Sequence, residues 1–282
     1  MKNLQLRALT GLLFVAVIVF CTVFSPVALY FLLSAVVLLT LAEFAQLTNR
    51  HAGASVNMPL NTFAGFLLMA ALCERFTGGV SLHLFVFYLL SLLCLFISEL
   101  YARKPDPLRN WTFAVASHAY IVLPMALLFK MTCTFDPFQG ELVHTWWFPL
   151  SIFLFLWTND TGAYLCGSAL HKRFPKKLFP RVSPNKSWVG SIGGGVLCLV
   201  TAALIWHFIP GKMLLWQWMG LAMTVCVFGT WGDLFESLLK RQLGVKDSGN
   251  ILPGHGGMLD RFDSTLLAVP AATAYFYFIG LC

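Results

Sequence analysis

Long apolar runs recur along almost the whole chain, and they constrain the fold more than any other feature. Of the 282 residues, 58% are hydrophobic and only 11% carry a charge, against roughly 25% charged residues in an ordinary soluble domain. Runs close to the roughly 20 residues that cross a hydrocarbon core must be helical there, because a helix satisfies its own backbone hydrogen bonds. The sequence therefore predicts an all-α, polytopic integral membrane protein.

Nine segments have the length and apolar character of a transmembrane helix. We expect these helices at residues 8–24, 27–47, 60–77, 82–101, 111–130, 147–167, 190–209, 213–231 and 264–281. The first is predicted to be a retained span, since Pro26 leads directly into the next apolar run. We expect two regions, N-terminal transmembrane helices at 1–131 and a C-terminal region at 132–282 that carries the unusual polar residues.

The positions of lysine and arginine predict the orientation, because cytoplasmic loops carry an excess of positive charge. Placing the N-terminus inside leaves only Arg75, Lys130 and Lys212 of the 19 Lys and Arg residues on the outer side. We therefore expect a cytoplasmic N-terminus, an odd number of spans and a location in a bacterial inner (plasma) membrane.

Two loops on the expected cytoplasmic side contain more than topological charge. Loops 168–189 and 232–263 combine dense Lys and Arg with Asp, Gly, Ser and His. Residues 232–241 continue the eighth apolar run as a helix, and helical spacing places five polar side chains near one face. These are Asp233, Glu236, Ser237, Lys240 and Arg241. One alternative for this cluster is a solvated salt-bridge network that caps helices at the membrane surface.

Carboxylates and glycines at this density also fit a site for a cation and a phosphate. Mg²⁺ prefers one or two carboxylates together with water and substrate phosphates. Glycines such as Gly256 and Gly257 allow backbone N–H groups to close on an anion. A single histidine such as His255 is more often a hydrogen-bonded loop residue than a ligand or base. Glu43 and Glu99 are placed at helix ends, where a paired carboxylate and a functional one are equally expected.

The second loop carries a dense set of residues at fixed spacing. They are Ser237-Leu-Leu-Lys240-Arg241, Lys246-Asp247-Ser248 and Pro253-Gly-His255-Gly-Gly-Met-Leu-Asp260-Arg261-Phe-Asp263. This set resembles the signature of the phosphatidate cytidylyltransferases, also called CDP-diacylglycerol synthases. Upstream, the resemblance includes Trp157, Asp160-Thr161-Gly162-Ala163-Tyr164, Gly167 and Ser183-Pro184-Asn185-Lys186-Ser187-Trp188. The first half resembles the family only in its spans and in Glu43-Phe44 at the end of the second.

The resemblance implies a reaction in which CTP and phosphatidate give CDP-diacylglycerol and pyrophosphate at a Mg²⁺-centred site. It implies metal ligands at Asp233 and Asp260, with Asp263, Asp247 and Asp160 as further candidates. It leaves open whether a second cation is present. It also suggests a homodimer, with CTP, phosphatidate and the lipid bilayer as the other partners.

The same resemblance assigns groups that bind phosphate. Residues expected to hold the triphosphate or the leaving pyrophosphate are Lys240, Arg241, Lys246 and Arg261. Residues expected to contact a substrate phosphate are Ser183, Lys186, Ser187, Gly256 and Gly257. His255 completes the implied catalytic set of Asp233, Asp260, Lys240 and Arg241.

Two positions depart from the family pattern. Val189 stands where the family usually has Glu, and Ser168 stands where it usually has Arg. Both departures remove a charge from the expected substrate side and leave the carboxylates intact. They favour altered substrate handling, or a divergent paralogue that acts on another lipid phosphate.

Two other functions remain as alternatives. A transporter would place polar groups near the midplane of both halves and would usually show an internal repeat, which this sequence lacks. A CTP-dependent lipid kinase needs similar metal and phosphate groups, but the combination of Ser-Pro-x-Lys with His-Gly-Gly argues against it. Nucleic-acid binding is not expected, because no stacking or groove-reading module accompanies the basic loops.

Overall fold

The computed structural model describes residues 2–136, 141–170, 172–251 and 256–281, and the chain forms two compact units. The first unit contains residues 1–146 and 242–262, and the second contains 147–241 and 263–282. The first division thus falls after residue 146, whereas the sequence suggested residue 131. Part of the second polar loop, 242–262, belongs to the unit formed by the N-terminal helices.

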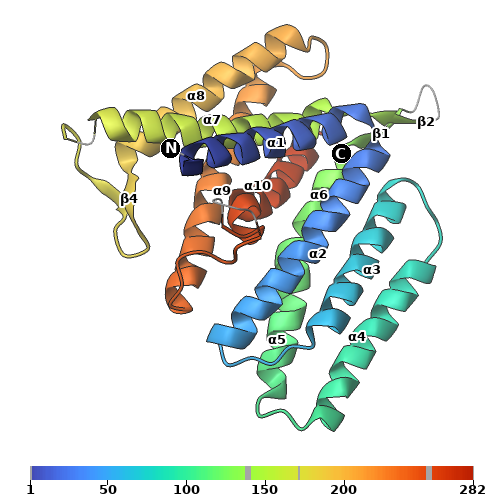
Figure 1. The fold of residues 1–282 in the computed structure, drawn as a ribbon. Coiled ribbons are helices and arrows are strands. Elements are labelled where there is room, and N and C mark those ends of the chain that lie inside the picture. Colours follow the sequence, from blue (N-terminus) through green and yellow to red (C-terminus); the bar gives the residue numbers. More distant parts are fainter. Residues whose placement is uncertain (1, 137–140, 171, 252–255, 282) are drawn as a thin grey trace. The chain divides into compact units, whose positions relative to one another are not determined.

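The first unit is a bundle of helices built around α2. Its elements are α1 (Lys2–Phe24), α2 (Pro26–His51), α3 (Met58–Phe76), α4 (His83–Ala102), α5 (Pro107–Ser117), a π-helical turn (His118–Val122), α6 (Leu123–Lys130), β1 (Cys133–Asp136) and β2 (Glu141–His144). Helix α2 contacts α1, α3, α5 and α6, and α3 in turn packs against α4 (Figure 1). Leu29, Leu33, Val37 and Leu41 on α2 are almost fully buried, so this helix provides the core of the unit.

Short polar residues and prolines set where several helices begin. Ser25 accepts a hydrogen bond from the Ala28 N–H at 3.0 Å, and Asp106 accepts one from the Arg109 N–H at 3.0 Å. A proline follows each of these capping residues, where its missing N–H costs nothing because the first turn leaves its donors unpaired. Such local signals define helix starts inside a chain that is apolar almost throughout.

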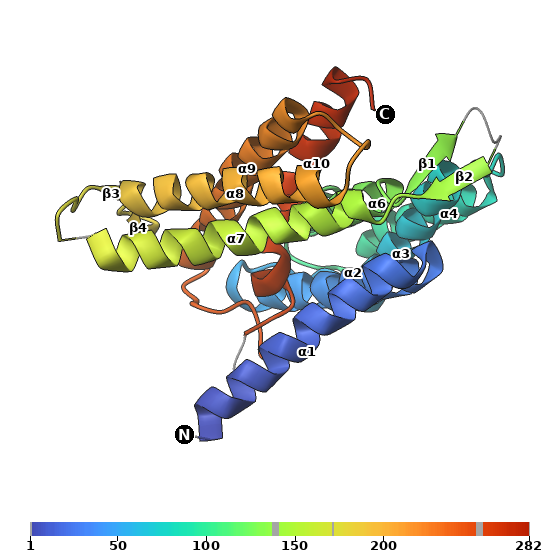
Figure 2. The same cartoon turned by 90° about the horizontal axis from the view of Figure 1, so that it is seen from above.

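The second unit consists of four helices and one short hairpin. Its elements are α7 (Trp147–Leu170), β3 (Lys177–Phe179), β4 (Ser183–Ser187), α8 (Trp188–Phe208), α9 (Leu215–Gln242) and, from Asp263 onward, α10 (Leu259–Phe278). Helices α7 and α8 lie side by side (Figure 2). The antiparallel hairpin, which pairs Lys177 with Ser187 and Phe179 with Ser183, was not predicted because its strands are short and mostly polar.

The predicted transmembrane segments are helical in the structure, and the all-α membrane class is confirmed. Within the described residues, five helical segments are long and apolar enough to cross a membrane: Pro26–His51, His83–Ala102, Pro107–Lys130, Trp188–Phe208 and Leu215–Gln242. The predicted continuation of the eighth span through residue 241 is also confirmed, since α9 ends at Gln242. That the remaining helices cross the bilayer stays a prediction.

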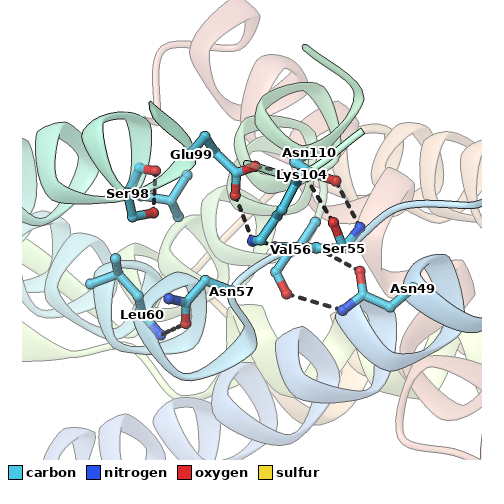
Figure 3. A network of polar contacts seen from close by, with 10 residues as sticks. Asn49, Ser55, Val56, Asn57, Leu60, Ser98, Glu99, Lys104 and Asn110 are labelled. Carbon is cyan, nitrogen blue, oxygen red and sulfur yellow. Dashed lines mark hydrogen bonds and ion pairs between the residues drawn. The ribbon is translucent and has the colours of Figure 1, made fainter. Parts of the chain in front are cut away.

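A buried polar network fastens the connection between α2 and α3 to α4 and α5 (Figure 3). The Glu99 carboxylate accepts from Lys104 Nζ at 2.7 Å and from Asn110 Nδ2 at 2.7 Å. Asn110 Oδ1 accepts the Ser55 N–H at 2.7 Å, and Lys104 Nζ also donates to the Ser55 carbonyl at 2.6 Å. Glu99 is therefore a paired structural carboxylate, because a charge buried in an apolar bundle is costly unless its hydrogen bonds are satisfied.

Replacing Asn110 by Ala should destabilise the first unit, because the partly buried Ser55 N–H and one buried Glu99 oxygen lose their amide partner. We expect a loss of about 1–3 kcal/mol, visible as a lower melting temperature in detergent. Thr112→Ala on the exposed side of the same helix is the matched control and should change stability by less than about 0.5 kcal/mol. Equal melting temperatures for the two variants would contradict the proposed role of the network.

Candidate functional site

A polar pocket of about 530 Å³ lies in the second unit, where the hairpin connects the end of α7 to the start of α8. Its polar lining residues are Asn159, Asp160, Tyr164, Ser168, Lys177, Asn185, Lys186, Ser187, Ser191 and Thr230. The lining thus includes two lysines and one carboxylate. Ser187 caps α8 by accepting the Gly190 N–H at 3.2 Å, so the pocket adjoins the positive end of that helix.

Glycines bring α7 and α8 close enough to form this pocket. A Cβ added at Gly162 would lie 2.9 Å from the Gly193 carbonyl oxygen, and one added at Gly194 would lie 2.7 Å from the Asn159 carbonyl oxygen. Such distances are shorter than real Cβ contacts, so these positions require glycine. In the glycine run at 193–195, Gly193 and Gly194 both contact α7, so these two positions form a packing face of small residues.

An ion pair connects the hairpin to α9. Lys186 Nζ on β4 lies 2.6 Å from Asp233 Oδ2, and Ser237 Oγ donates to Asp233 Oδ1 at 3.2 Å. The Asp233 side chain is 32% exposed, so it remains reachable from solvent. The structure therefore brings together the loop at 168–189 and the first part of the segment at 232–263, as the sequence suggested.

Helix α10 contributes a second carboxylate to this region. A Cβ at Gly232 would lie 2.6 Å from the Asp263 carbonyl oxygen, so the glycine allows α9 and α10 to cross in contact. Burial, together with the nearby carboxylates of Asp233 and Asp160, raises the pKa of the Asp263 side chain well above its ordinary value. Negative charge is thus concentrated where these elements meet, which is the arrangement that a cation relieves.

The basic end of α9 is partly neutralised within the helix. Glu236 is fully buried, and its Oε2 lies 2.5 Å from Lys240 Nζ, one helical turn further along. Arg241 is exposed. The predicted proximity of acidic and basic side chains on this helix is confirmed for the pair Glu236–Lys240, and Asp233 contacts Ser237 one turn away.

In the first unit, the segment 242–262 folds around a carboxylate from α2. Glu43 is 4% exposed, and it accepts hydrogen bonds from the Ser248 hydroxyl and from the Met258 N–H at 2.7 Å. The Leu259 N–H approaches the same carboxylate at 3.4 Å. A Cβ at Gly257 would collide with Glu43, so this glycine is needed to admit the carboxylate.

Asp260 holds the same segment from the other side. Its Oδ2 accepts the N–H of Ser248 at 3.0 Å and the N–H of Gly257 at 2.8 Å. Gly256 has a φ of 77°, a conformation that favours glycine. The backbone N–H groups that the sequence suggested for phosphate binding are therefore directed, at Gly257 and Ser248, toward a carboxylate of the protein.

Glu43 is the residue that sequence reasoning underestimated. Its placement at a helix end is wrong, because α2 continues through Thr48 and Asn49 to His51. The available signal was a carboxylate within an apolar run, which is functional or paired by default. Its partners lie about 200 residues further along the chain, and no spacing rule could have identified them.

The other predicted site residues are divided between the two units. Asp160, Asp233 and Asp263 belong to the second unit, while Asp247 and Asp260 belong to the first. Lys246, Asp247 and Arg261 are exposed, and Ser183 lies half-buried on β4. His255 falls outside the described residues. Across the described part of the chain, no three His, Cys, Asp or Glu side chains are grouped closely enough to hold a metal ion together.

Replacing Glu43 by Gln should weaken the contacts of the segment 242–262 with α2. The NH₂ group of the new amide is a donor, and it would face the Ser248 hydroxyl and the Met258 N–H, which both donate to Glu43. We expect the Met258 amide to exchange its hydrogen about tenfold faster, as for a lost hydrogen bond of about 1.4 kcal/mol. Hydrogen exchange followed by mass spectrometry measures this. Glu141→Gln at an exposed position of strand β2 is the control. Unchanged exchange at Met258 in Glu43→Gln would show that the Glu43 carboxylate does not hold this segment.

Comparison with known proteins places this arrangement in a family. A model described as the cytidylyltransferase family matches residues 5–279. The chain is 38% identical to a phosphatidate cytidylyltransferase of Haemophilus influenzae over 178 residues, which are 62% of this chain and 59% of that protein. It is 40% identical over 158 residues to one from Staphylococcus aureus (strain COL), 56% of each chain.

A third relative, the phosphatidate cytidylyltransferase of Staphylococcus haemolyticus, is 45% identical over 121 residues, 43% of this chain and 45% of that protein. The chain therefore spans about half the length of these curated relatives. The family model, in contrast, covers nearly the whole chain, and the protein accordingly belongs to the cytidylyltransferase family.

Proposed function

We propose that this membrane protein transfers the cytidylyl group of CTP to phosphatidate, giving CDP-diacylglycerol and pyrophosphate. The observation that carries the proposal is the pocket in the second unit, which is lined by Lys177, Lys186 and Asp160 and whose Lys186 also pairs with Asp233. The names of the three relatives support it, since each is called a phosphatidate cytidylyltransferase.

The proposed reaction joins two anions. A phosphate oxygen of phosphatidate forms a bond to the α-phosphorus of CTP, and the bond between the α-phosphorus and its bridging oxygen to the β-phosphate breaks. The pyrophosphate leaves with that oxygen. Because a phosphate monoester is already anionic near neutral pH, the attack needs little help from a general base. The main requirement is to hold two polyanions in line and offset their repulsion.

The residues of the pocket suit this requirement. Lys186 and Lys177 supply positive charge, and the first turn of α8 adds the partial positive charge of a helix N-terminus. The Ser187 oxygen accepts the Gly190 N–H, which leaves its hydroxyl hydrogen for a substrate phosphate. Lys186 pairs with Asp233 in the structure, so substrate binding would exchange one anionic partner of this lysine for another.

Mg²⁺ fits the donor set of the second unit. Asp233 lies close enough to Asp263 to disfavour the negative charge on the Asp263 carboxylate. Mg²⁺ commonly uses one or two carboxylates with water and substrate phosphates. Asp233 and Asp263 would hold the ion there, while Asp160, and Asp247 and Asp260 of the first unit, stay predicted ligands. When bound, the ion would neutralise developing charge on the reacting phosphates. A second cation is not required by this donor set.

We place the pocket on the cytoplasmic side of a bacterial inner membrane, with the N-terminus on the same side. The distribution of Lys and Arg supports this orientation, and CTP is supplied from the cytoplasm. Ser168 lines the pocket and Val189 lies in the first turn of α8, so both departures from the family pattern adjoin the proposed phosphate site. A second copy of the chain remains a proposed partner.

Purified protein in detergent with CTP, phosphatidate and Mg²⁺ should release pyrophosphate and form CDP-diacylglycerol in equal amounts. Both products can be measured, by a coupled pyrophosphate assay and by lipid mass spectrometry. Diacylglycerol in place of phosphatidate is the control, and its phosphorylation would instead indicate a lipid kinase. A folded protein that forms neither product would overturn the proposed activity.

Replacing Asp233 by Asn should lower kcat by at least about 100-fold, because a charged group near the reacting phosphates is lost. Its melting temperature should change little, since both Asp233 and Lys186 are partly exposed and water can solvate the unpaired lysine. Glu141→Gln serves as the control and should retain full activity. Near-normal turnover in Asp233→Asn would show that this carboxylate has no role in the reaction.

A further inference from the structure

A second cavity of the second unit adjoins the polar pocket and has the opposite character. It measures about 480 Å³ and lies between β3, α8 and α9. Its lining residues include Phe179, Trp188, Ile192, Val196, Met223 and Trp231. We call this cavity the α8–α9 groove. It shares Ser191 and Thr230 with the polar pocket, so the two cavities are contiguous at these residues.

The α8–α9 groove follows the direction of α8. Ser191, Gly195 and Leu199 lie at intervals of four residues, and at 1.5 Å per residue they cover about 12 Å along the helix. Ile192 is 64% exposed and Val196 is 55% exposed, so the groove opens to the outside along its length. Because α8 is one of the segments apolar enough to cross a membrane, this opening would face hydrocarbon rather than water in a bilayer.

Gly195 has a different role from its glycine neighbours. Side chains at Gly193 and Gly194 are excluded by contacts with α7, which lies against that side of α8. A Cβ at Gly195 would meet its nearest neighbours, Cys226 Sγ and Met223 Sδ and Cε, at 3.8–4.0 Å, which is ordinary van der Waals contact. Helix packing therefore does not require glycine at position 195. Its missing side chain instead leaves the middle of the α8–α9 groove open.

We propose that the α8–α9 groove seats one acyl chain of the lipid substrate while its phosphate occupies the polar pocket, and that Gly195 sets how far the chain extends. This inference rests on the proposed function and adds to it the seat of the lipid tail. The continuity of the two cavities supports it, since a phospholipid joins a phosphate to a hydrocarbon chain. Apolar lining with a few polar groups at one end is typical of sites that bind such ligands.

The test compares Gly195→Phe with Val200→Phe, using phosphatidate with short (dioctanoyl) and long (dioleoyl) chains. Val200 is 51% exposed on α8 and lies outside the groove lining, so it is the matched control. For each variant, kcat/KM for the long lipid is divided by kcat/KM for the short lipid. In Gly195→Phe we expect this quotient to fall about tenfold, which is the effect of leaving roughly two methylene groups of the chain unburied. The change should appear in KM, with kcat for the short lipid kept within about twofold.

A binding measurement separates this inference from the proposed function. Long-chain phosphatidate should raise the melting temperature of the parent protein and of Val200→Phe more than that of Gly195→Phe. If long-chain phosphatidate stabilises the parent protein in this way but no CDP-diacylglycerol forms, the lipid-binding role of the groove is supported and the proposed reaction is contradicted. If the parent is active and Gly195→Phe keeps the parent's chain-length dependence in both kcat/KM and melting temperature, the inference is overturned. The groove would then be occupied by a bulk lipid or another helix.

A uniform loss for both lipids in Gly195→Phe would also contradict the inference, because it would indicate general damage to the site. Melting temperatures without lipid show whether the variant is folded. If Gly195→Phe proves unstable, Gly195→Leu fills less of the groove and should show the same preference for short chains to a smaller degree.

Discussion

A charge inside an apolar helical protein must be paired or hydrogen-bonded, and this requirement organises the first unit of the chain. Glu99 accepts hydrogen bonds from Lys104 and Asn110, and both of these residues also bond to the connection between α2 and α3. Glu43 accepts hydrogen bonds from the Ser248 hydroxyl and the Met258 N–H, and these bonds hold the loop that carries them against α2. The satisfaction of a few carboxylates thus determines where long stretches of polar backbone lie in a protein whose helices are otherwise held by apolar packing.

Close approach of helices is the second determinant, and glycine makes it possible. Gly162 and Gly194 allow α7 and α8 to touch through backbone atoms, which places Asp160 beside the start of α8. Gly232 does the same for α9 and α10 and brings Asp263 near Asp233. The carboxylates of the second unit are therefore concentrated by helix packing rather than by one local motif, and their mutual repulsion leaves the region suited to a cation.

The second unit also combines two environments that a reaction between a nucleotide and a lipid needs. Lysines and a helix N-terminus surround the polar pocket, and apolar side chains of α8 and α9 line the groove that continues from it. Such a depression suits a substrate with a phosphate head and a hydrocarbon tail better than a small polar solute. Membership in the cytidylyltransferase family agrees with this chemistry. Glu43 and Asp260, in the first unit, instead shape a loop whose N–H groups bond to the protein itself.

The sequence by itself determined the membrane class, the helical segments and the extension of α9, because apolar length and helical periodicity are local properties. From motif spacing it also predicted which side chains carry the chemistry. It did not reveal the hairpin β3–β4, whose short strands give little signal, or the division of the polar loop 232–263 between the two units. Only the tertiary structure paired Lys186 with Asp233, surrounded Glu43 with partners about 200 residues away, and distinguished Gly195 from Gly194. These features depend on which helix faces lie against one another, and packing between distant segments decides that.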